Sequence, residues 1–379
     1  MNQLTLNYKN LIGAVMASTI GVLFYNVMPI YLGYLMESKN LNYAQIGYLA
    51  SAFFLAFSIP SASAYFWARS IKPRSISLIS IFFILIFLFI STITDSYTNL
   101  ILEILVVGSF SGILATLAMT IIGDSKNPTR WYGFKSASES AAGTILLFVL
   151  PATLIVSYGF NGVVYGMLIF IILSIPLVML VSNEPLLDSN EIISRESLVT
   201  NISPIYVCMA LLAVFFNYVT GSAIWAFAER IADIKDFDSI LVANALGLTL
   251  AFAIIGPLIS SSISDKFGLK VPFIIASLMM LIGAYGITSA NTILEYAIFA
   301  CIQMLGWGGG LPFLYSLVSK SDPNGRYITL AIPAVGLGSV VGPALAGNLI
   351  GESDSMYSLQ VLVVSCMIIS ILMGWKSIK

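Results

Sequence analysis

The sequence predicts an all-α integral membrane protein with twelve transmembrane helices, arranged as two pseudo-symmetric bundles of six. Three observations support this prediction: an apolar composition, a series of long charge-free runs, and motifs that recur in the two halves. Of the 379 residues, 58% are hydrophobic and 9% are charged, whereas soluble domains have about 45–50% and about 25%. So few charges cannot cover a surface in water, so lipid must solvate this chain. Soluble enzymes, nucleic-acid-binding proteins and disordered scaffolds are therefore excluded.

The charge-free runs predict the individual helices, because a helix that crosses a bilayer needs about 20 apolar residues. The runs cover residues 10–36, 40–68, 75–94, 104–123, 140–183, 197–228, 239–264, 271–294, 296–319, 327–351 and 355–375. The fifth is long enough for two helices, and its Tyr-Gly-Phe-Asn-Gly segment at 158–162 predicts the turn between them. These runs are too long for the strands of a β-barrel, and lipid does not tolerate irregular exposed backbone, so all twelve elements are expected to be helices.

Lysine and arginine predict the orientation. With both termini on the cytoplasmic side, 14 of the 17 Lys and Arg residues lie in cytoplasmic segments, and only Lys39, Arg230 and Lys235 lie outside. This positive-inside bias supports an even number of spans. We expect a multi-pass protein of a bacterial inner membrane with cytoplasmic N- and C-termini.

The longest polar stretch divides the chain. It predicts a first bundle at 1–182, a cytoplasmic linker at 183–203 and a second bundle at 204–379. The halves match at an offset of roughly 195 residues. Pro128 corresponds to Pro323, Pro60 corresponds to Pro257, and Phe24-Tyr25-Asn26 corresponds to Phe216-Asn217-Tyr218. Duplicated halves are typical of transporters.

Several absences from the sequence limit the chemistry. The chain has no histidine, no GxxxxGK[ST] loop and three widely separated cysteines, so we expect no ATPase, no metal site, no disulfide framework and no cofactor. A net charge of −1 offers no field for nucleic acid. The expected partners are the lipid bilayer, a small-molecule substrate and protons, and the expected state is a monomer.

A motif after the eighth predicted helix carries a family resemblance. Residues 261–270, Ser-Ser-Ile-Ser-Asp-Lys-Phe-Gly-Leu-Lys, resemble the GxxxD(R/K)xG(R/K)(R/K) signature of the major facilitator superfamily. Residues 64–74 hold an eroded copy with Ala68 at the aspartate position, and 338–347 hold a Gly-Pro pattern common in the family. The resemblance implies that Asp265, Lys266 and Gly268 form a conformational latch with Arg130 at the start of the fifth helix. Arg326 has the matching place in the second half. The alternative is that the lysines only anchor the loop.

In this family, the first, fourth, seventh and tenth helices line the substrate cavity. The polar and aromatic residues there are the expected substrate-binding residues: Tyr25, Asn26, Asn217, Tyr218, Trp225, Gln303 and Trp307. An unpaired amide costs several kcal/mol in lipid. Asn26 and Asn217 are therefore expected either to bind substrate or to hydrogen-bond between helices.

Ionisable residues within spans are functional candidates by default. Glu139 lies among small residues of the fifth helix, so it is either a proton-coupling carboxylate or half of an ion pair with Lys135 or Arg130. Glu103, near the outer end of the fourth helix, is the second coupling candidate; alternatively, its side chain reaches the surface.

The resulting prediction is a secondary active transporter that moves a small organic molecule by alternating access, as proton-coupled efflux by antiport. The alternatives are uptake of a sugar- or siderophore-type molecule, facilitated diffusion and, more remotely, a membrane-embedded enzyme.

The latch gives a testable prediction. Asp265→Asn should shift the balance between inward-open and outward-open states and depress transport, because Ala68 in the first half cannot replace the carboxylate. Membrane insertion should be unchanged. Transport assays and cysteine accessibility on both sides check this, and wild-type behaviour in both measurements would contradict the latch.

Overall fold

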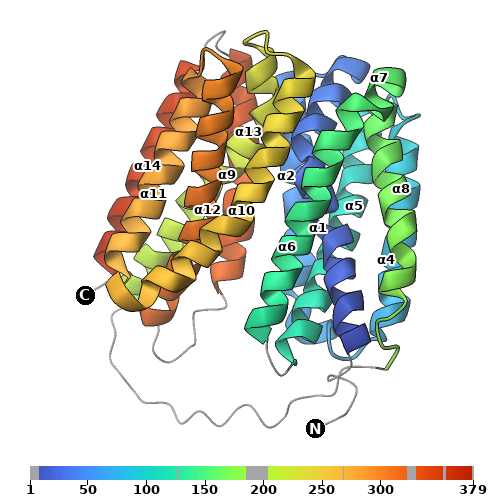
Figure 1. Ribbon diagram of the computed structural model, residues 1–379, viewed down its shortest axis with the longest axis horizontal. Helices are drawn as coiled ribbons and strands as arrows, with labels where there is room; N and C mark the ends of the chain where they lie inside the picture. The colour runs from blue at the N-terminus through green and yellow to red at the C-terminus, as the bar shows by residue number, and fades with distance from the viewer. Residues whose placement is uncertain are drawn as a thin grey trace. The chain divides into compact units, whose positions relative to one another are not determined.

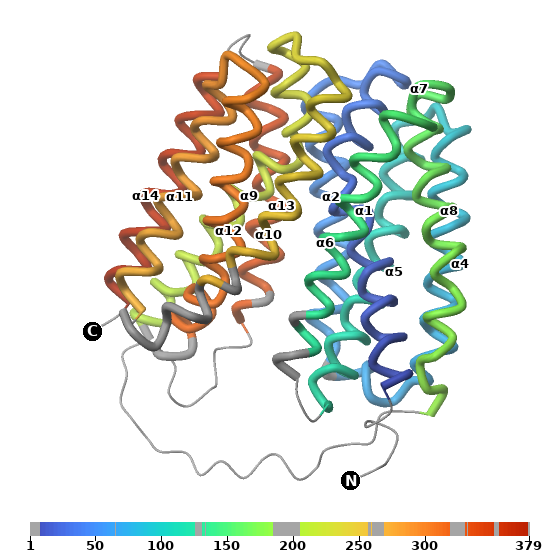
Figure 2. Tube along the Cα trace, viewed as in Figure 1, coloured from blue at the N-terminus to red at the C-terminus, as the bar shows by residue number. Residues whose placement is uncertain are grey.

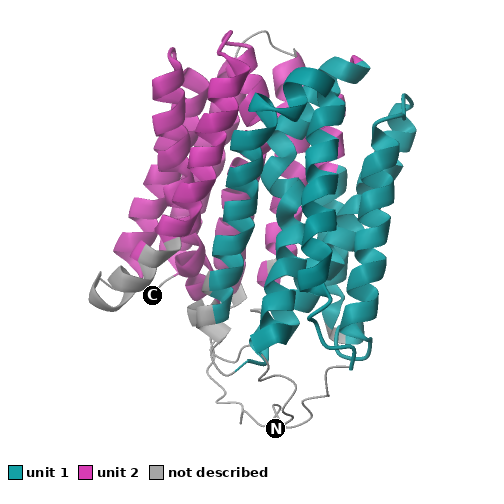
Figure 3. Cartoon of the chain, turned by 45° about the vertical axis from the view of Figure 1, so that its right-hand side comes forward, with its two compact units in different colours: residues 1–39, 52–194 teal, residues 40–51, 195–379 magenta. Residues whose placement is uncertain are grey.

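In the computed structural model of the protein, the described residues are 8–125, 128–184, 204–267, 269–321, 330–352 and 356–377. Every regular element in these ranges is a helix. The chain divides into two units, which Figure 3 shows in different colours: the first holds Met1–Lys39 and Ala52–Ser194, the second Asn40–Ser51 and Arg195–Lys379. Each unit is described by itself below.

The first unit contains α1, the second part of α2, and α3 to α8; most of these helices are labelled in Figure 1. Their bounds are α1 Tyr8–Lys39, α2 Tyr43–Ala62, α3 Ala64–Trp67, α4 Pro73–Ser91, α5 Tyr97–Gly123, α6 Pro128–Ala152, α7 Leu154–Tyr158 and α8 Phe160–Val178. Helix α1 is the central element of this unit, because it packs against α5, α6 and α8.

The second unit contains α9 to α14. Their bounds are α9 Pro204–Asp233, α10 Ser239–Phe267, α11 Lys270–Ser289, α12 Ile293–Ser321, α13 Ala331–Glu352 and α14 Tyr357–Ser377. Helix α9 packs against α12, α13 and α14, and α11 runs beside α12, as the tube in Figure 2 shows. The contacts of α9 match those of α1 helix by helix, which is the repeat that the sequence predicts.

Eleven helices of the described residues are long and apolar enough to cross a membrane by length and composition. The exception is α6, which begins at Pro128 and carries Lys135 and Glu139 in its first half. With α6, the spans form the predicted twelve-helix fold, and the short α3 and α7 are additional turns of helix.

Local sequence signals set several helix ends. Proline is the first residue of α4, α6 and α9, where its fixed φ suits a helix and its missing N–H costs nothing. At the start of α2, Asn42 and Gln45 cap each other: the Gln45 N–H donates to Asn42 Oδ1 at 2.8 Å, and the Asn42 N–H donates to Gln45 Oε1 at 2.9 Å. Gly159 has a φ of +53° between α7 and α8, which confirms the predicted turn at 158–162.

Residues 40–51, which the sequence assigns to the first bundle, group with the second unit. This first part of α2 lies against α13, since Ser51 Oγ donates to the Val340 carbonyl oxygen at 2.6 Å and Tyr48 Oη to Asn348 Oδ1 at 3.1 Å. Gly47 and Gly347 let the backbones meet, because the Cα of Gly347 would lie 3.2 Å from a Cβ added at Gly47. A charge-free run cannot reveal such a partner.

Close backbone contact also joins α11 and α12. A Cβ at Gly306 would meet the backbone nitrogen of Met280 and would lie 2.6 Å from the carbonyl oxygen of Ala276. Small residues at such a crossing allow the close packing that drives helix association in lipid.

We therefore expect Gly306→Ala to lower the stability of the protein by about 1–3 kcal/mol through overpacking. Gly310→Ala, one turn along the same helix, is the matched control, because its Cβ would meet only the Ala276 Cβ at an ordinary 3.6 Å. The thermal unfolding midpoint of each variant in detergent, followed by tryptophan fluorescence, checks this. Equal midpoints for both variants would refute the packing argument.

Candidate functional site

In the second unit, the candidate residues lie on two helices, α9 and α12. The side chains of Asn217 on α9 and Gln303 on α12 are 3% and 1% exposed. Asn217 Oδ1 and Gln303 Nε2 have no hydrogen-bond partner among the described residues. Such atoms are rare in a folded interior, because a buried polar group without a partner costs about 1–3 kcal/mol. They offer one acceptor and one donor for a bound molecule.

Aromatic side chains flank these amides. Tyr218 meets the ring of Trp307 edge-on, with centroids 5.9 Å apart. Trp307 also borders Gly221, where an added Cβ would lie 3.4 Å from the indole ring. An aromatic wall beside a few fixed hydrogen-bonding groups is the usual composition of a small-molecule site.

The levels of the two amides follow from the contacts along α9 and α12. Near the start of α12, the Tyr296 hydroxyl donates to the Ala228 carbonyl oxygen near the end of α9 at 2.7 Å. Farther along α12, the ring of Trp307 contacts the ring of Tyr218, which lies earlier in α9. The two helices therefore run antiparallel. Asn217 is next to Tyr218 on α9, and Gln303 lies one turn from Trp307 toward Tyr296 on α12, so the two amides lie at two different levels of this helix pair.

Trp225 is a core residue of the second unit. It is the largest of the fully buried side chains in this part of the protein. Its predicted role as a substrate contact stays a prediction.

In the first unit, Asn26 is engaged in helix packing. Its Nδ2 donates to the main-chain carbonyl oxygen of Glu139 at 2.8 Å, so it joins α1 to the middle of α6. Of the two readings that the sequence leaves open for Asn26, this geometry matches the interhelical bond. Tyr25 beside it is half-buried and meets Phe54 edge-on, with centroids 5.6 Å apart.

Glu139 is part of an ion pair. Lys135 Nζ lies 2.8 Å from Glu139 Oε1, and these side chains are 14% and 12% exposed. The hydroxyl of Ser18 on α1 donates to the same oxygen. The hydroxyls of Thr19 and Ser138 are hydrogen-bonded to each other, with their oxygens 2.8 Å apart. The structure thus shows the Lys135 pair that the sequence gives as an alternative to proton coupling. Ser18 was not predicted, since one serine in an apolar run carries no signal of its partner.

Glu103 does not reach the surface. Its side chain is 5% exposed, and Thr94 donates from its hydroxyl to Glu103 Oε1 at 2.6 Å. The alternative that the Glu103 side chain reaches the surface is therefore wrong, because α4 and the residues after it cover this position of α5.

The latch residues cannot be placed. Gly268 and Arg326, and the side chains of Arg130, Asp265 and Lys266, lie outside the described part of the chain. In the eroded first-half copy, Arg69 makes a two-fold hydrogen-bonded ion pair with Asp124, at 2.8 and 3.0 Å, which joins the end of α3 to the end of α5. The latch stays a prediction.

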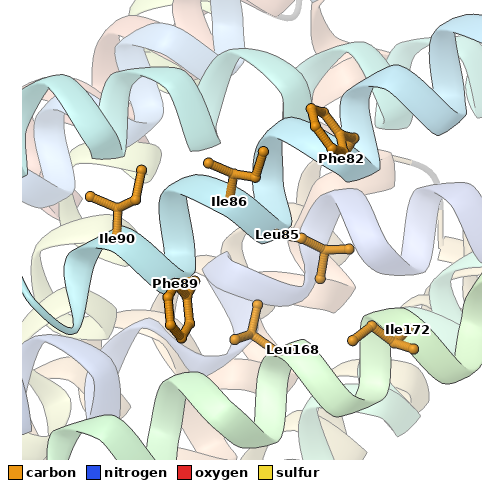
Figure 4. A pocket seen from close by; sticks show the side chains of 7 residues that line it. All are labelled: Phe82, Leu85, Ile86, Phe89, Ile90, Leu168 and Ile172. Atoms are coloured by element: carbon orange, nitrogen blue, oxygen red, sulfur yellow. The ribbon is translucent and has the colours of Figure 1, made fainter.

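A groove of about 390 Å³ lies between α4 and α8 of the first unit, and Figure 4 shows its lining. All seven lining residues are apolar: Phe82, Leu85, Ile86, Phe89, Ile90, Leu168 and Ile172. With no hydrogen-bonding side chain, the groove suits lipid acyl chains better than a polar substrate. Within the described ranges, no group of three or more Cys, Asp or Glu residues has the arrangement of a metal site.

The spanning helices of the two units, with buried polar side chains in their interiors, define a multi-pass integral membrane protein. The chain belongs to the Major Facilitator Superfamily, whose family model matches residues 13–343. This confirms the family that the motif of residues 261–270 indicates.

Three known proteins are similar to this chain in sequence or in fold. Over 135 residues it is 30% identical to Multidrug resistance protein 3 of Bacillus subtilis (strain 168), and this match covers 35% of the chain and only 26% of that protein's length. A mutant of the nucleoside transporter NupG has a TM-score of 0.75 at 12% identity, over 97% of this chain and 98% of that one. The structure of the D-xylose-proton symporter has a TM-score of 0.75 at 12% identity, over 98% of each chain. At this identity the two structures show the fold alone.

The ion pair on α6 generates a prediction. Glu139→Gln should leave the Lys135 ammonium without its carboxylate, lowering stability by about 1–3 kcal/mol for a partly buried pair. Gradient-driven transport and exchange should then fall together. Thermal unfolding and both transport modes in proteoliposomes check this.

The double variant Lys135→Gln with Glu139→Gln is the control, since removing both charges should recover part of the lost stability. If Glu139→Gln keeps wild-type stability and exchange but loses gradient-driven accumulation, Glu139 is a coupling carboxylate instead.

Proposed function

We propose that the protein is a secondary active transporter for a small, neutral, hydrogen-bonding organic molecule, moved across a bacterial inner membrane by alternating access. The observation that carries the proposal is the pair of buried amides on α9 and α12. Asn217 Oδ1 and Gln303 Nε2 lack partners among the described residues. A substrate that supplies a donor and an acceptor would remove the cost of burying both groups.

The chemistry of these groups favours a neutral substrate. An amide oxygen and an amide nitrogen match hydroxyl, carbonyl or amide groups, and neither carries the charge that would compensate an ionised substrate. The rings of Tyr218 and Trp307 add an apolar surface on which a sugar or heterocyclic ring can lie. Sites that hydrogen-bond their substrate reject analogues without these groups, so we expect marked selectivity.

Export is the proposed direction, with cytoplasmic termini. It is supported by the similarity to Multidrug resistance protein 3, although this covers only 35% of the chain. The second candidate is uptake or facilitated diffusion. It is favoured by the Lys135–Glu139 ion pair, which occupies one of the two carboxylates proposed for proton coupling.

The proposal predicts opposite outcomes for the two matched asparagines. Asn217→Ala should weaken substrate binding about 3- to 10-fold, the worth of one hydrogen bond, with little loss of stability. Asn26→Ala should lower the unfolding temperature, because it breaks the bond to α6, and should affect affinity less. A panel of neutral sugars, nucleosides and drugs, screened by thermal shift, supplies the compound whose binding and flux are measured in proteoliposomes.

The contrary results are specific. Normal substrate binding in both Asn217→Ala and Gln303→Ala would show that the substrate does not bind at these two amides of α9 and α12. If no compound in the panel binds or shows saturable flux in either direction, the transport of neutral molecules itself is contradicted.

A further inference from the structure

The buried carboxyl group of Glu103 has an environment that neither helix packing nor the proposed substrate site explains. Glu103 on α5 is 5% exposed, and only one of its oxygens is satisfied, by the Thr94 hydroxyl at 2.6 Å. Its Oε2 has no hydrogen-bond partner among the described residues. Glu103 thus differs from Glu139, whose carboxylate receives both the Lys135 ammonium and the Ser18 hydroxyl.

A second polar atom without a partner lies beside it. The phenol of Tyr31 on α1 is within electrostatic range of Glu103 and is fully buried between the rings of Phe24 and Phe160. Its hydroxyl has no hydrogen-bond partner within the described ranges. The nearby Ser91 hydroxyl instead donates to the Leu88 carbonyl oxygen at 2.7 Å.

The charged groups that face this position come from the end of α1 and the segment after α4. Lys39 acts electrostatically on Glu103, but its ammonium is paired with Asp95 at 2.8 Å. The Lys39 side chain is 10% exposed and the Asp95 side chain 91%. Helix α8 contributes Phe160, which carries no charge.

An ionised carboxylate in this setting would be poorly stabilised. Moving a bare carboxylate out of water costs several kcal/mol even after relaxation. Here one hydroxyl donates to it, and the Lys39 ammonium that acts on it is paired with Asp95. The protonated acid carries no net charge, and its hydroxyl has a potential acceptor in the phenol oxygen of Tyr31.

We propose that Glu103 is a proton-binding site of the first unit, neutral in this conformation, and that Lys39 is its alternative partner when the proton leaves. The assignment deepens the proposed function by naming a proton as the coupling ion, and it rests on that function for its role in transport. Tyr31 and Thr94 are positioning residues that hold the acid.

The exchange of partners balances the charges. When Glu103 releases its proton to water, the Lys39 ammonium turns from Asp95 to the new Glu103 carboxylate, so the buried anion gains a cation. Asp95 can give up its partner at low cost, because its exposed carboxylate is hydrated. Re-protonation of Glu103 returns Lys39 to Asp95, and the end of α1 changes its contacts in each cycle.

Infrared spectroscopy of the full chain in lipid vesicles, without any substrate, tests the assignment. A protonated carboxyl group has its own C=O stretching band, and the expected result is a band at neutral pH that disappears at alkaline pH. The band should be lost in Glu103→Gln and kept in Glu184→Gln, an exposed carboxylate of the same unit.

Two further variants test the role of Lys39. Lys39→Gln removes the cation that favours the ionised form, so the band should persist to a pH higher by about one unit. Asp95→Asn frees Lys39 for Glu103 and should move the midpoint to lower pH. A Glu103 that only packs would show neither shift.

Three results would overturn the proposal: no neutral-pH band in the wild-type protein, a band that survives in Glu103→Gln, or a carboxylate signal that responds to sodium ions and not to pH. The last would identify a sodium site. Because the measurement needs no substrate, its failure contradicts the Glu103 assignment alone, whereas failure of the compound panel contradicts the proposed function alone.

Discussion

Hydrocarbon contains no water to accept or donate a hydrogen bond, and this constraint shapes the rest of the protein. It forces every spanning segment into a helix, since only a helix satisfies its own backbone groups. It also makes each polar side chain informative, because the cost of leaving it without a partner is high. Asn26 satisfies the constraint through the Glu139 carbonyl oxygen and Glu139 through Lys135. Among the described residues, Asn217, Gln303 and Glu103 keep atoms without a hydrogen-bond partner, so the same cost of burial makes these three residues functional candidates.

The two halves use one ancestral pattern differently. Helices α1 and α9 make matching contacts in their own units, and both carry an Asn next to a Tyr. In the first unit the Asn has become part of the packing of α1 on α6, and the polar groups there are joined in ion pairs and hydroxyl contacts. In the second unit the Asn is buried, and its side-chain oxygen has no hydrogen-bond partner in the described part of the chain. The hydrogen bond of Asn26 is thus absent at the equivalent Asn217 among the described residues, and this difference underlies the proposed binding role of Asn217.

Much of the fold can be predicted from the sequence, because lipid leaves a strong compositional signal. The charge-free runs identify the spans, and the glycine of the 158–162 segment identifies the turn, since its φ of +53° suits few other residues. The choice of partners is not encoded so locally. Nothing near Ser18 or Tyr31 in the chain indicates that each lies beside a carboxylate of another helix. The grouping of residues 40–51 with the second unit likewise depends on Gly347 and Val340, about 300 residues away.

The bond from Asn26 to α6 ends on a main-chain oxygen, not on a side chain. Any residue at position 139 that keeps the helix intact supplies the same acceptor. This bond between α1 and α6 therefore does not depend on which side chain position 139 carries, whereas the contact of Ser18 with the Glu139 carboxylate does. A substitution at position 139 can therefore change the charge there and keep this bond. The charge carried by α6 and this link between the two helices are thus set by different atoms of the same residue.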